Sequence, residues 1–259
     1  LTADKEEAVA TTPERRQVAV LFADLCGFTE LSTTVDAEEL RRIAGRFLAR
    51  ADEIVVARGG TVDKHIGDAT MAVFGAPVAH EDDPLRAVAA ADDLQRAMPA
   101  LSAELGRDLA THVGIALGDV VAGEVGGELR RDYTVVGETV NLAARLVGEA
   151  GPGETMMSEA VWRAVAQRVH ATAMGERALK GLARPQRFWR LESLADSVAS
   201  NRLPFVGREV ELAQASAVLA TAQAGVLLHL RGEAGIGKSR LLAEILARAI
   251  ELGFESIVT

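Results

Sequence analysis

The stretch "VAVLFADLCGFT", residues 18–29, decides the fold of this chain. Its continuous apolar run is typical of a buried β-strand. The run leads into Asp24, and the chain then turns at Cys26 and Gly27. A strand that buries its side chains has no structural use for a carboxylate at its end. Asp24 therefore indicates a functional group at the open end of a strand.

Helical and extended patterns interleave outward from this strand. One pair of strands follows directly as a hairpin that turns at Gly67 and Asp68, and this pair interrupts the alternation of strands and helices. The pattern predicts an α+β fold with helices packed on a mixed sheet, rather than a doubly wound fold. Helices are expected over residues 36–57, 84–105, 138–150 and 159–167, and strands over residues 16–25, 61–75, 111–125, 132–137, 154–158 and 186–192.

Composition narrows the class of protein. The chain has 259 residues, of which 49% are hydrophobic and 25% charged, an ordinary globular composition. Cys26 is the only cysteine, so no internal disulfide is possible. The polar start does not resemble a signal peptide, and no apolar run has the ~20 residues of a membrane span. The net charge of −9 argues against a nucleic-acid or membrane surface. We therefore expect a cytoplasmic protein.

The sequence divides into four regions by composition and periodicity. A polar leader precedes the first domain, and a polar linker without clear periodicity separates that domain from a second one. The expected boundaries are residues 1–15 for the leader, 16–193 for the first domain, 194–203 for the linker and 204–259 for the N-terminal part of the second domain.

Two carboxylates lie beside glycines at the ends of predicted strands, Asp24 before Gly27 and Asp68 after Gly67. Each could be an ordinary turn residue. A hard dication offers another use, because Mg²⁺ is usually held by one or two carboxylates together with substrate phosphates. Two such aspartates at neighbouring strand ends could hold a metal pair for phosphoryl chemistry. Gly27 would let the backbone approach a phosphate closely.

A second group of polar residues lies on the predicted helix at residues 138–150. Asn141 and Arg145 are four residues apart and share one stripe of a helix that is otherwise apolar. Such a pair is often only a solvated surface. An arginine fork is also well suited to charge that develops on a phosphate in a transition state.

Four motifs in order resemble a class III nucleotidyl cyclase catalytic domain over residues 16–193: "FADLCGFTELS", "DKHIGDATMAVFG", "DYTVVGETVNLAARL" and "LKGLARPQRFWRL". The resemblance implies a cyclase-type mixed sheet with a ferredoxin-like core. It implies that Asp24 and Asp68, with the carbonyl of Leu25 as an extra ligand, hold two Mg²⁺ or Mn²⁺ ions. The ribose 3′-oxygen would then attack the α-phosphorus in line, and pyrophosphate would leave.

The resemblance also implies roles for other residues. Arg145 matches the position that stabilises charge on the α-phosphate, and Asn141 matches the one that orients the ribose. Lys180 loosely matches the lysine that binds the triphosphate, although it could be a plain exposed turn residue. Phe28 and Thr29 are expected to contact phosphate through their backbone N–H groups.

Lys64 and Thr134 are expected to read the base. Lys64 only donates hydrogen bonds and suits N1 of adenine, while the Thr134 hydroxyl can accept from the 6-amino group. Guanine reverses both polarities, so ATP is the expected substrate and GTP the alternative. Within the family, threonine at position 134 resembles a subgroup that includes bicarbonate-responsive soluble cyclases, so bicarbonate is a possible activator.

The family places the metal-binding and base-reading residues of one site on two subunits, which implies a homodimer with sites at the interface. The expected function is therefore an adenylyl cyclase in signal transduction. The alternative from another class is a catalytically silent, cyclase-like module that senses ATP and governs the region that follows it.

The second region carries "GEAGIGKS", which fits the phosphate-loop pattern G-x-x-x-x-G-K-[ST]. A helix is expected over residues 205–223, a strand over 225–232 and a helix after the loop. "FVGREVELA" resembles the entry to AAA- or STAND-type signalling ATPases. No acidic strand end follows, so hydrolysis by this stretch alone is doubtful, and a glycine-rich turn is the alternative. The nucleotide-binding residues would be Gly232, Gly235, Gly237, Lys238 and Ser239.

Overall fold

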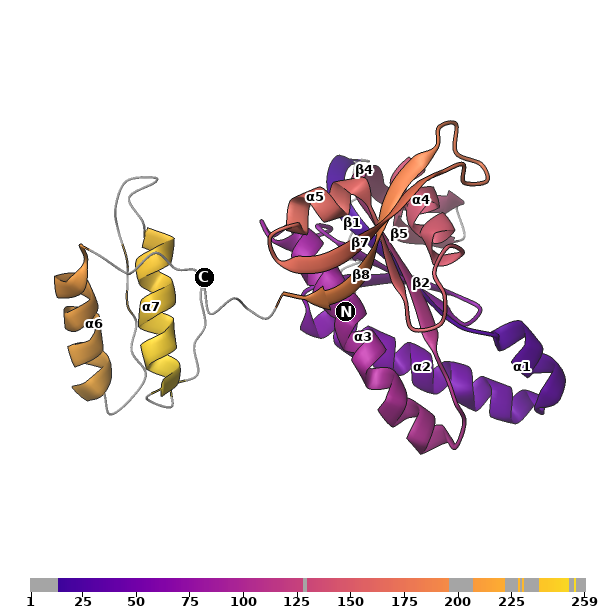
Figure 1. Cartoon of the computed structure of the whole chain (residues 1–259), viewed down its shortest axis with the longest axis horizontal. Coiled ribbons are helices and arrows are strands. Elements are labelled where there is room, and N and C mark those ends of the chain that lie inside the picture. Colours follow the sequence, from indigo (N-terminus) through magenta and orange to yellow (C-terminus); the bar gives the residue numbers. More distant parts are fainter. Residues whose placement is uncertain are drawn as a thin grey trace, which may run out of the picture. The chain divides into compact units, whose positions relative to one another are not determined.

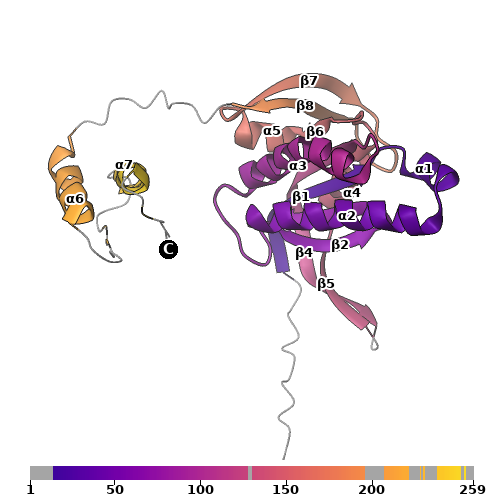
Figure 2. The ribbon, with the colours of Figure 1, turned by 90° about the horizontal axis from the view of Figure 1, so that it is seen from below.

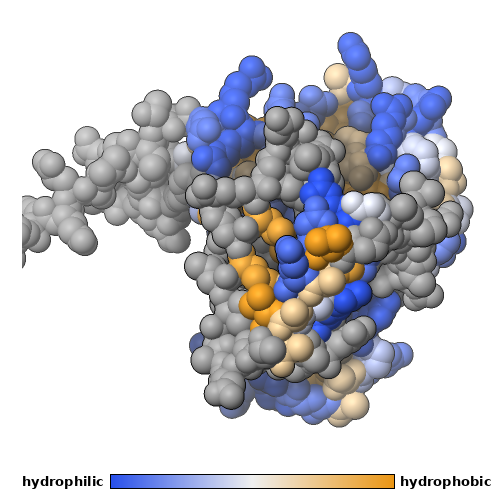
Figure 3. Space-filling model, turned by 90° about the vertical axis from the view of Figure 1, so that its left-hand side faces the viewer, coloured by the Kyte–Doolittle hydropathy of each residue, from blue (hydrophilic) through white to orange (hydrophobic). Residues whose placement is uncertain are grey.

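The computed structural model describes residues 14–127, 130–195, 207–221, 228, 230, 238–251 and 254. The chain divides into two compact units, Leu1–Val198 and Ala199–Thr259, and each is described by itself. No helix in these ranges combines the length and the apolar character that crossing a bilayer requires. Among the coloured residues in Figure 3, hydrophilic side chains predominate and apolar ones form small groups between them.

The first unit is built on one mixed sheet (Figures 1 and 2). Its strands follow the order β2-β3-β1-β4-β6-β8-β7, and β5 pairs with β4 outside this path. The pairing is antiparallel everywhere except between β4 and β6. The mixed α+β architecture predicted from the sequence is therefore confirmed. The strands are β1 (Glu14–Leu25), β2 (Thr61–Ile66), β3 (Ala69–Phe74), β4 (Thr111–Gly127), β5 (Arg130–Val136), β6 (Thr155–Ser158), β7 (Val169–Arg177) and β8 (Gln186–Leu194).

Helices cover both faces of this sheet. The larger core joins α2, α3 and α5 to one face, and Figure 2 shows α2 and α3 side by side. The smaller core joins α4 to the other face. The helices of this unit are α1 (Phe28–Thr34), α2 (Ala37–Ala57), α3 (Asp83–Leu105), α4 (Glu138–Val147) and α5 (Glu159–Val165).

Strand β1 shows how the apolar run serves both cores. Its side chains alternate, so that Leu21 and Ala23 enter the larger core while Val20 and Phe22 pack toward α4. This is why the run is continuous rather than alternating. Asp24 is the next residue in the series that faces α4.

Helix α4 lies very close to β4. A Cβ atom at Gly114 would collide with the backbone of α4 at Ala143 and would lie 2.6 Å from the backbone nitrogen of Val147. Only glycine allows this approach. The position of α4, which carries Asn141 and Arg145, is therefore set by backbone contact with the sheet.

Two elements of the first unit were not predicted, α1 and β7. Helix α1 has only seven residues and no buried side chain, so it lacks the apolar stripe that reveals a helix. Strand β7 is the last strand in the sheet order, and its exposed residues do not alternate with buried ones. Neither element carries a periodic signal in the sequence.

The second unit contains α6 (Glu209–Thr221) and α7 (Lys238–Glu251), which pack through a small apolar cluster. Helix α7 begins at Lys238, directly after the glycines of the phosphate-loop pattern. The glycines themselves, Gly232, Gly235 and Gly237, lie outside the described residues, as does most of the strand expected over residues 225–232. The cluster consists of Leu212, Ala215, Leu219, Leu241, Ile245 and Ala249.

Candidate active site

The sheet brings Asp24 and Asp68 together. Asp24 is the penultimate residue of β1, and Asp68 lies in the turn between β2 and β3, after Gly67 at φ +67°. Strands β1 and β3 are neighbours, and Ala23 pairs with Thr70. This register places the hairpin turn beside the end of β1, so the two carboxylates meet although 44 positions separate them in the sequence.

The two carboxylates repel each other. Burial, and then the neighbouring Asp24, raises the pKa of Asp68 to about 7. Burial would also raise the pKa of Asp24, but interactions with His112 and Asp68 outweigh it and leave that pKa below its usual value. The pair therefore holds excess negative charge that only a cation or a proton can neutralise.

His112, which the sequence analysis did not single out, lies beside Asp24 and carries a positive charge when its ring is protonated. It pairs with Asp24 across β1 and β4, and its Nε2 lies 3.6 Å from Asp24 Oδ2. This separation is too long for a hydrogen bond, so the contact is an electrostatic attraction when the His112 ring is protonated. The attraction to Asp24 raises the pKa of His112.

The carboxylate pair fits a hard metal ion. Asp24 Oδ1 and Asp68 Oδ2 are both buried and have no hydrogen-bond partner, and a buried charged oxygen without a partner is costly. Oxygen ligands of this kind are what Mg²⁺ and Mn²⁺ prefer. Within the described ranges, no group of three or more His, Cys, Asp or Glu side chains could hold a metal by itself. Further ligands would have to come from the backbone, water or phosphate.

The backbone after Asp24 leaves N–H groups free at the same end of the strand. The side chain of Leu25 is buried in the larger core, so only its backbone can face a ligand. Gly27 adopts φ +70° and precedes α1. The first helical hydrogen bond runs from the N–H of Leu31 to Gly27, so the N–H groups of Phe28 and Thr29 have no acceptor inside the helix.

Lys64 and Thr134 are in direct contact. Lys64 Nζ lies 2.8 Å from Thr134 Oγ1, which joins β2 to β5 across 70 positions of sequence. A third residue, Asp63, completes this group. The hydroxyl of Thr134 donates to Asp63 Oδ2 at 2.8 Å. The sequence analysis did not name Asp63, although it directly precedes Lys64.

Asn141 and Arg145 lie one turn apart on the exposed side of α4, while Ala143 and Leu146 are buried. Neither side chain has a hydrogen-bond or ion-pair partner among the described residues. Lys180 is exposed in the turn that follows β7 and is also unpartnered in that part of the chain. All three side chains are available to a ligand.

The predicted site residues form separate groups in one chain. Asp24 and Asp68 form the first, Lys64 and Thr134 the second, and the exposed face of α4 the third. No hydrogen bond or ion pair among residues 14–127 and 130–195 connects the carboxylate pair to either of the other groups.

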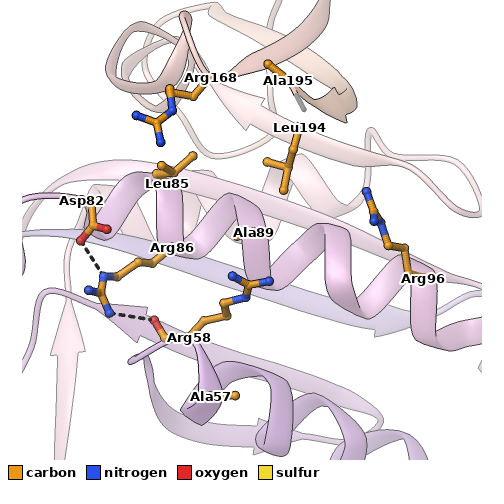
Figure 4. A pocket seen from close by; sticks show the side chains of 10 residues that line it. All are labelled: Ala57, Arg58, Asp82, Leu85, Arg86, Ala89, Arg96, Arg168, Leu194 and Ala195. Carbon is orange, nitrogen blue, oxygen red and sulfur yellow. Dashed lines mark hydrogen bonds and ion pairs between the residues drawn. The ribbon is translucent and has the colours of Figure 1, made fainter. Parts of the chain in front are cut away.

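A hollow of about 570 Å³ lies elsewhere in this unit (Figure 4). Four arginines line it together with apolar residues of α3 and β8, whereas Asp24 and Asp68 do not. Three of the arginines are neutralised by aspartates in or just before α3, so the hollow has little excess positive charge. These pairs are Arg58 with Asp93, Arg86 with Asp82, and Arg96 with Asp92.

Residues 11–193 match the family described as the adenylate and guanylate cyclase catalytic domain. The match spans more than half of the chain and includes both carboxylates, Lys64, Thr134 and α4. The chain is a member of this cyclase family. Class III cyclases generally use divalent metals such as Mg²⁺ or Mn²⁺, in agreement with the unpartnered carboxylate oxygens.

Two solved cyclases are similar to this domain. The adenylyl cyclase CyaB from P. aeruginosa is 30% identical with a TM-score of 0.69, and the match covers 71% of this chain and 97% of that chain. The guanylyl cyclase Cya2 is 31% identical with a TM-score of 0.69, and covers 73% of this chain and 98% of that one. The similarity therefore establishes a nucleotidyl cyclase domain, and the choice of base depends on the residues of the site.

Curated relatives are longer than this chain. An uncharacterized protein of Mycobacterium tuberculosis is 43% identical over 137 residues, which are 51% of this chain and 23% of that protein. The chain thus spans about a quarter of the length of the relatives it matches.

Proposed function

We propose that this cyclase domain converts ATP to 3′,5′-cyclic AMP and pyrophosphate and serves in signal transduction. The contact between Lys64 and Thr134 carries the choice of ATP. Lys64 only donates hydrogen bonds, so it suits N1 of adenine and opposes the N1–H group of guanine. The 2.8 Å contact supports a shared role for Lys64 and Thr134 on one edge of the base.

Asp24 and Asp68, together with the carbonyl of Leu25, would hold two Mg²⁺ or Mn²⁺ ions. When bound, these ions supply the positive charge that acidifies the ribose 3′-hydroxyl and offsets the charge of the phosphates. The unpartnered oxygens of the two aspartates support this assignment.

The other residues bind and orient the substrate. Asn141 would position the ribose, and Arg145 would stabilise the charge that develops on the α-phosphate. Lys180 and the N–H groups of Phe28 and Thr29, after the turn at Gly27, would bind the remaining phosphates. The 3′-oxygen forms a bond to the α-phosphorus, the bond to pyrophosphate breaks, and the hydroxyl proton passes to water.

A homodimer would complete the site. In one chain, Asp24 and Asp68 have no hydrogen bond or ion pair with Asn141, Arg145 or Lys64 among the described residues. Two copies related by a twofold axis would place the carboxylates of one subunit opposite α4 and Lys64 of the other, which gives two equivalent sites.

Product analysis tests this function. Purified protein is incubated with ATP or GTP and with Mg²⁺ or Mn²⁺, and the products are separated by chromatography. Cyclic AMP that disappears in the Arg145→Ala variant supports the proposal. Cyclic GMP as the main product would show a guanylyl cyclase. A dimer that binds ATP but forms no cyclic product with either metal would favour the ATP-sensing module.

For the second unit we propose the start of a phosphate-loop ATPase domain. The pattern of Gly232, Gly235, Gly237, Lys238 and Ser239, followed directly by α7, supports it. Two classes of binding site for a fluorescent ATP analogue, of which the Lys238→Ala change removes one, would support it, and a single class that this change leaves intact would contradict it. We also propose bicarbonate as an activator on the basis of Thr134, and cyclase turnover with added bicarbonate at constant pH is the test.

A further inference from the structure

Asp63 is a buried carboxylate within the group that would read the base. Its side chain is only 5% exposed, whereas that of Lys64 is 43% exposed. Asp63 Oδ2 lies 2.8 Å from Thr134 Oγ1 and 3.1 Å from Lys64 Nζ. A half-exposed ion pair with Lys64 contributes little to stability. The burial of Asp63 is therefore better explained by its bond to Thr134.

A β-bulge makes this arrangement possible. Val62 pairs with Ala72 and Lys64 pairs with Met71, so Asp63 is an extra residue in β2 without a partner on β3. Consecutive residues of a regular strand point to opposite faces, and a bulge redirects them. As a result, the side chains of Asp63 and Lys64 both reach Thr134 Oγ1.

These contacts fix the hydrogen-bond direction of the Thr134 hydroxyl. A hydroxyl has one proton to donate and two lone pairs. The Asp63 carboxylate only accepts, so it takes the proton of Thr134. The Lys64 ammonium only donates, so its hydrogen bond occupies one of the two lone pairs of Thr134 Oγ1. Thr134 can then offer a base only a lone pair, which suits the 6-amino group of adenine and repels the 6-oxo group of guanine.

We propose that Asp63 is a specificity-determining residue, which holds the Thr134 hydroxyl as an acceptor and so favours a 6-amino purine over a 6-oxo purine. This inference rests on the proposed function of the site. Asp63 acts through Thr134 and does not itself touch the base, so it is a positioning residue.

The experiment compares ATP with inosine 5′-triphosphate (ITP), which differs from ATP only at the edge formed by N1 and C6. The measured quantity is the ratio of kcat/KM for the two substrates. One hydrogen bond corresponds to roughly a tenfold change, so Asp63→Ala is expected to lower the ATP-to-ITP ratio by about tenfold. A defect that is only structural would lower turnover of both substrates equally and leave the ratio unchanged.

Combined variants show whether Asp63 acts through Thr134. Asp63→Ala is expected to change the ratio in the natural background and to have no further effect beside Thr134→Val. Asp52→Ala is the matched control, because it removes an exposed aspartate bound to His65 of the same hairpin. The control is expected to keep the natural ratio.

The outcomes separate this inference from the proposed function. If the unaltered protein makes no cyclic AMP or prefers ITP, the proposed function fails. If it prefers ATP and Asp63→Ala leaves the ratio within twofold, the role of Asp63 is refuted and the function stands. Asp63→Leu, which has a similar side-chain shape and no hydrogen-bond acceptor, replaces Asp63→Ala if the alanine variant does not fold. Thr134→Val with an unchanged ratio would also refute the role of Asp63.

Discussion

Replacing Asp68 by asparagine tests how much the electrostatic repulsion between Asp24 and Asp68 destabilises the metal-free domain. Burial and Asp24 raise the pKa of Asp68 from 3.8 to about 7. The folded state therefore binds this proton more tightly than the unfolded state does. The free energy of unfolding should then fall as the pH rises from about 4 to about 7. In Asp68→Asn the side chain does not titrate, so this pH-dependent loss of stability is absent.

The expected size of the loss follows from the pKa shift. About three pKa units correspond to about 4 kcal/mol at 1.36 kcal/mol per unit. Asp68 is partly exposed, so screening by solvent reduces the value to about 2 kcal/mol. In a domain of this size, that difference corresponds to roughly 4–8 °C in Tm.

Urea unfolding in the presence of a chelator, between pH 5 and pH 8, measures the effect. Both tryptophans of the chain, Trp162 and Trp189, are stacked with ring centroids 4.6 Å apart in the cyclase domain, so their fluorescence reports on that domain. We expect the unaltered protein to lose about 1.3 kcal/mol relative to Asp68→Asn over this range, because about two of the three pKa units fall between pH 5 and pH 7. Mg²⁺ or Mn²⁺ at pH 8 should raise the free energy of unfolding of the unaltered protein far more than that of the variant.

The comparison between the two proteins isolates Asp68. The raised pKa of His112 gives stability below about pH 6.5 that is lost as the pH rises, but this occurs in both proteins. Glu53→Gln removes an exposed carboxylate bound to Arg50 and should change stability by less than about 1 kcal/mol at any pH. A difference between Asp68→Asn and the unaltered protein that is independent of pH would refute the reasoning.

Three further predictions concern the fold, the base and the dimer. Gly114→Ala should lower the free energy of unfolding by roughly 1–3 kcal/mol in a urea titration, because the new methyl group meets the backbone of α4; unchanged stability would show that α4 moves freely. Lys64→Glu combined with Thr134→Cys should weaken the preference for ATP over GTP in a competition assay, and an unchanged preference would contradict the assignment of the base site. Asp68→Ala and Arg145→Ala should each be inactive alone and should recover about a quarter of the natural turnover when mixed equally, since mixed dimers keep one intact site; no recovery would contradict a shared site.

The sequence predicted those parts of the fold that local patterns determine. The run that ends at Asp24 and the hairpin around Gly67 carry clear apolar and turn signals, and the structure has both elements as predicted. Helix α1 and strand β7 have no buried stripe or alternation. Their formation depends on contacts with neighbouring segments of the same chain, which the local sequence pattern does not reveal.

The candidate site likewise contains residues that local sequence patterns reveal and residues that only the strand pairing brings together. Asp24 and Asp68 stand out because carboxylates at strand ends are unusual, and the register of β1 and β3 then joins them. Asp63 does not stand out, because regular alternation would point it away from Lys64, and the bulge that reverses this is visible only in the strand pairing. His112 likewise reaches Asp24 only through the pairing of β1 with β4.

The hairpin of β2 and β3 has a mechanical consequence for a two-site enzyme. It carries Lys64 on one strand and Asp68 at its turn, four positions apart. In the proposed dimer these two residues would serve different sites, one through the base and the other through the metals. A substitution that displaces this hairpin would therefore disturb the base contacts of one site and the metal ligands of the other at the same time.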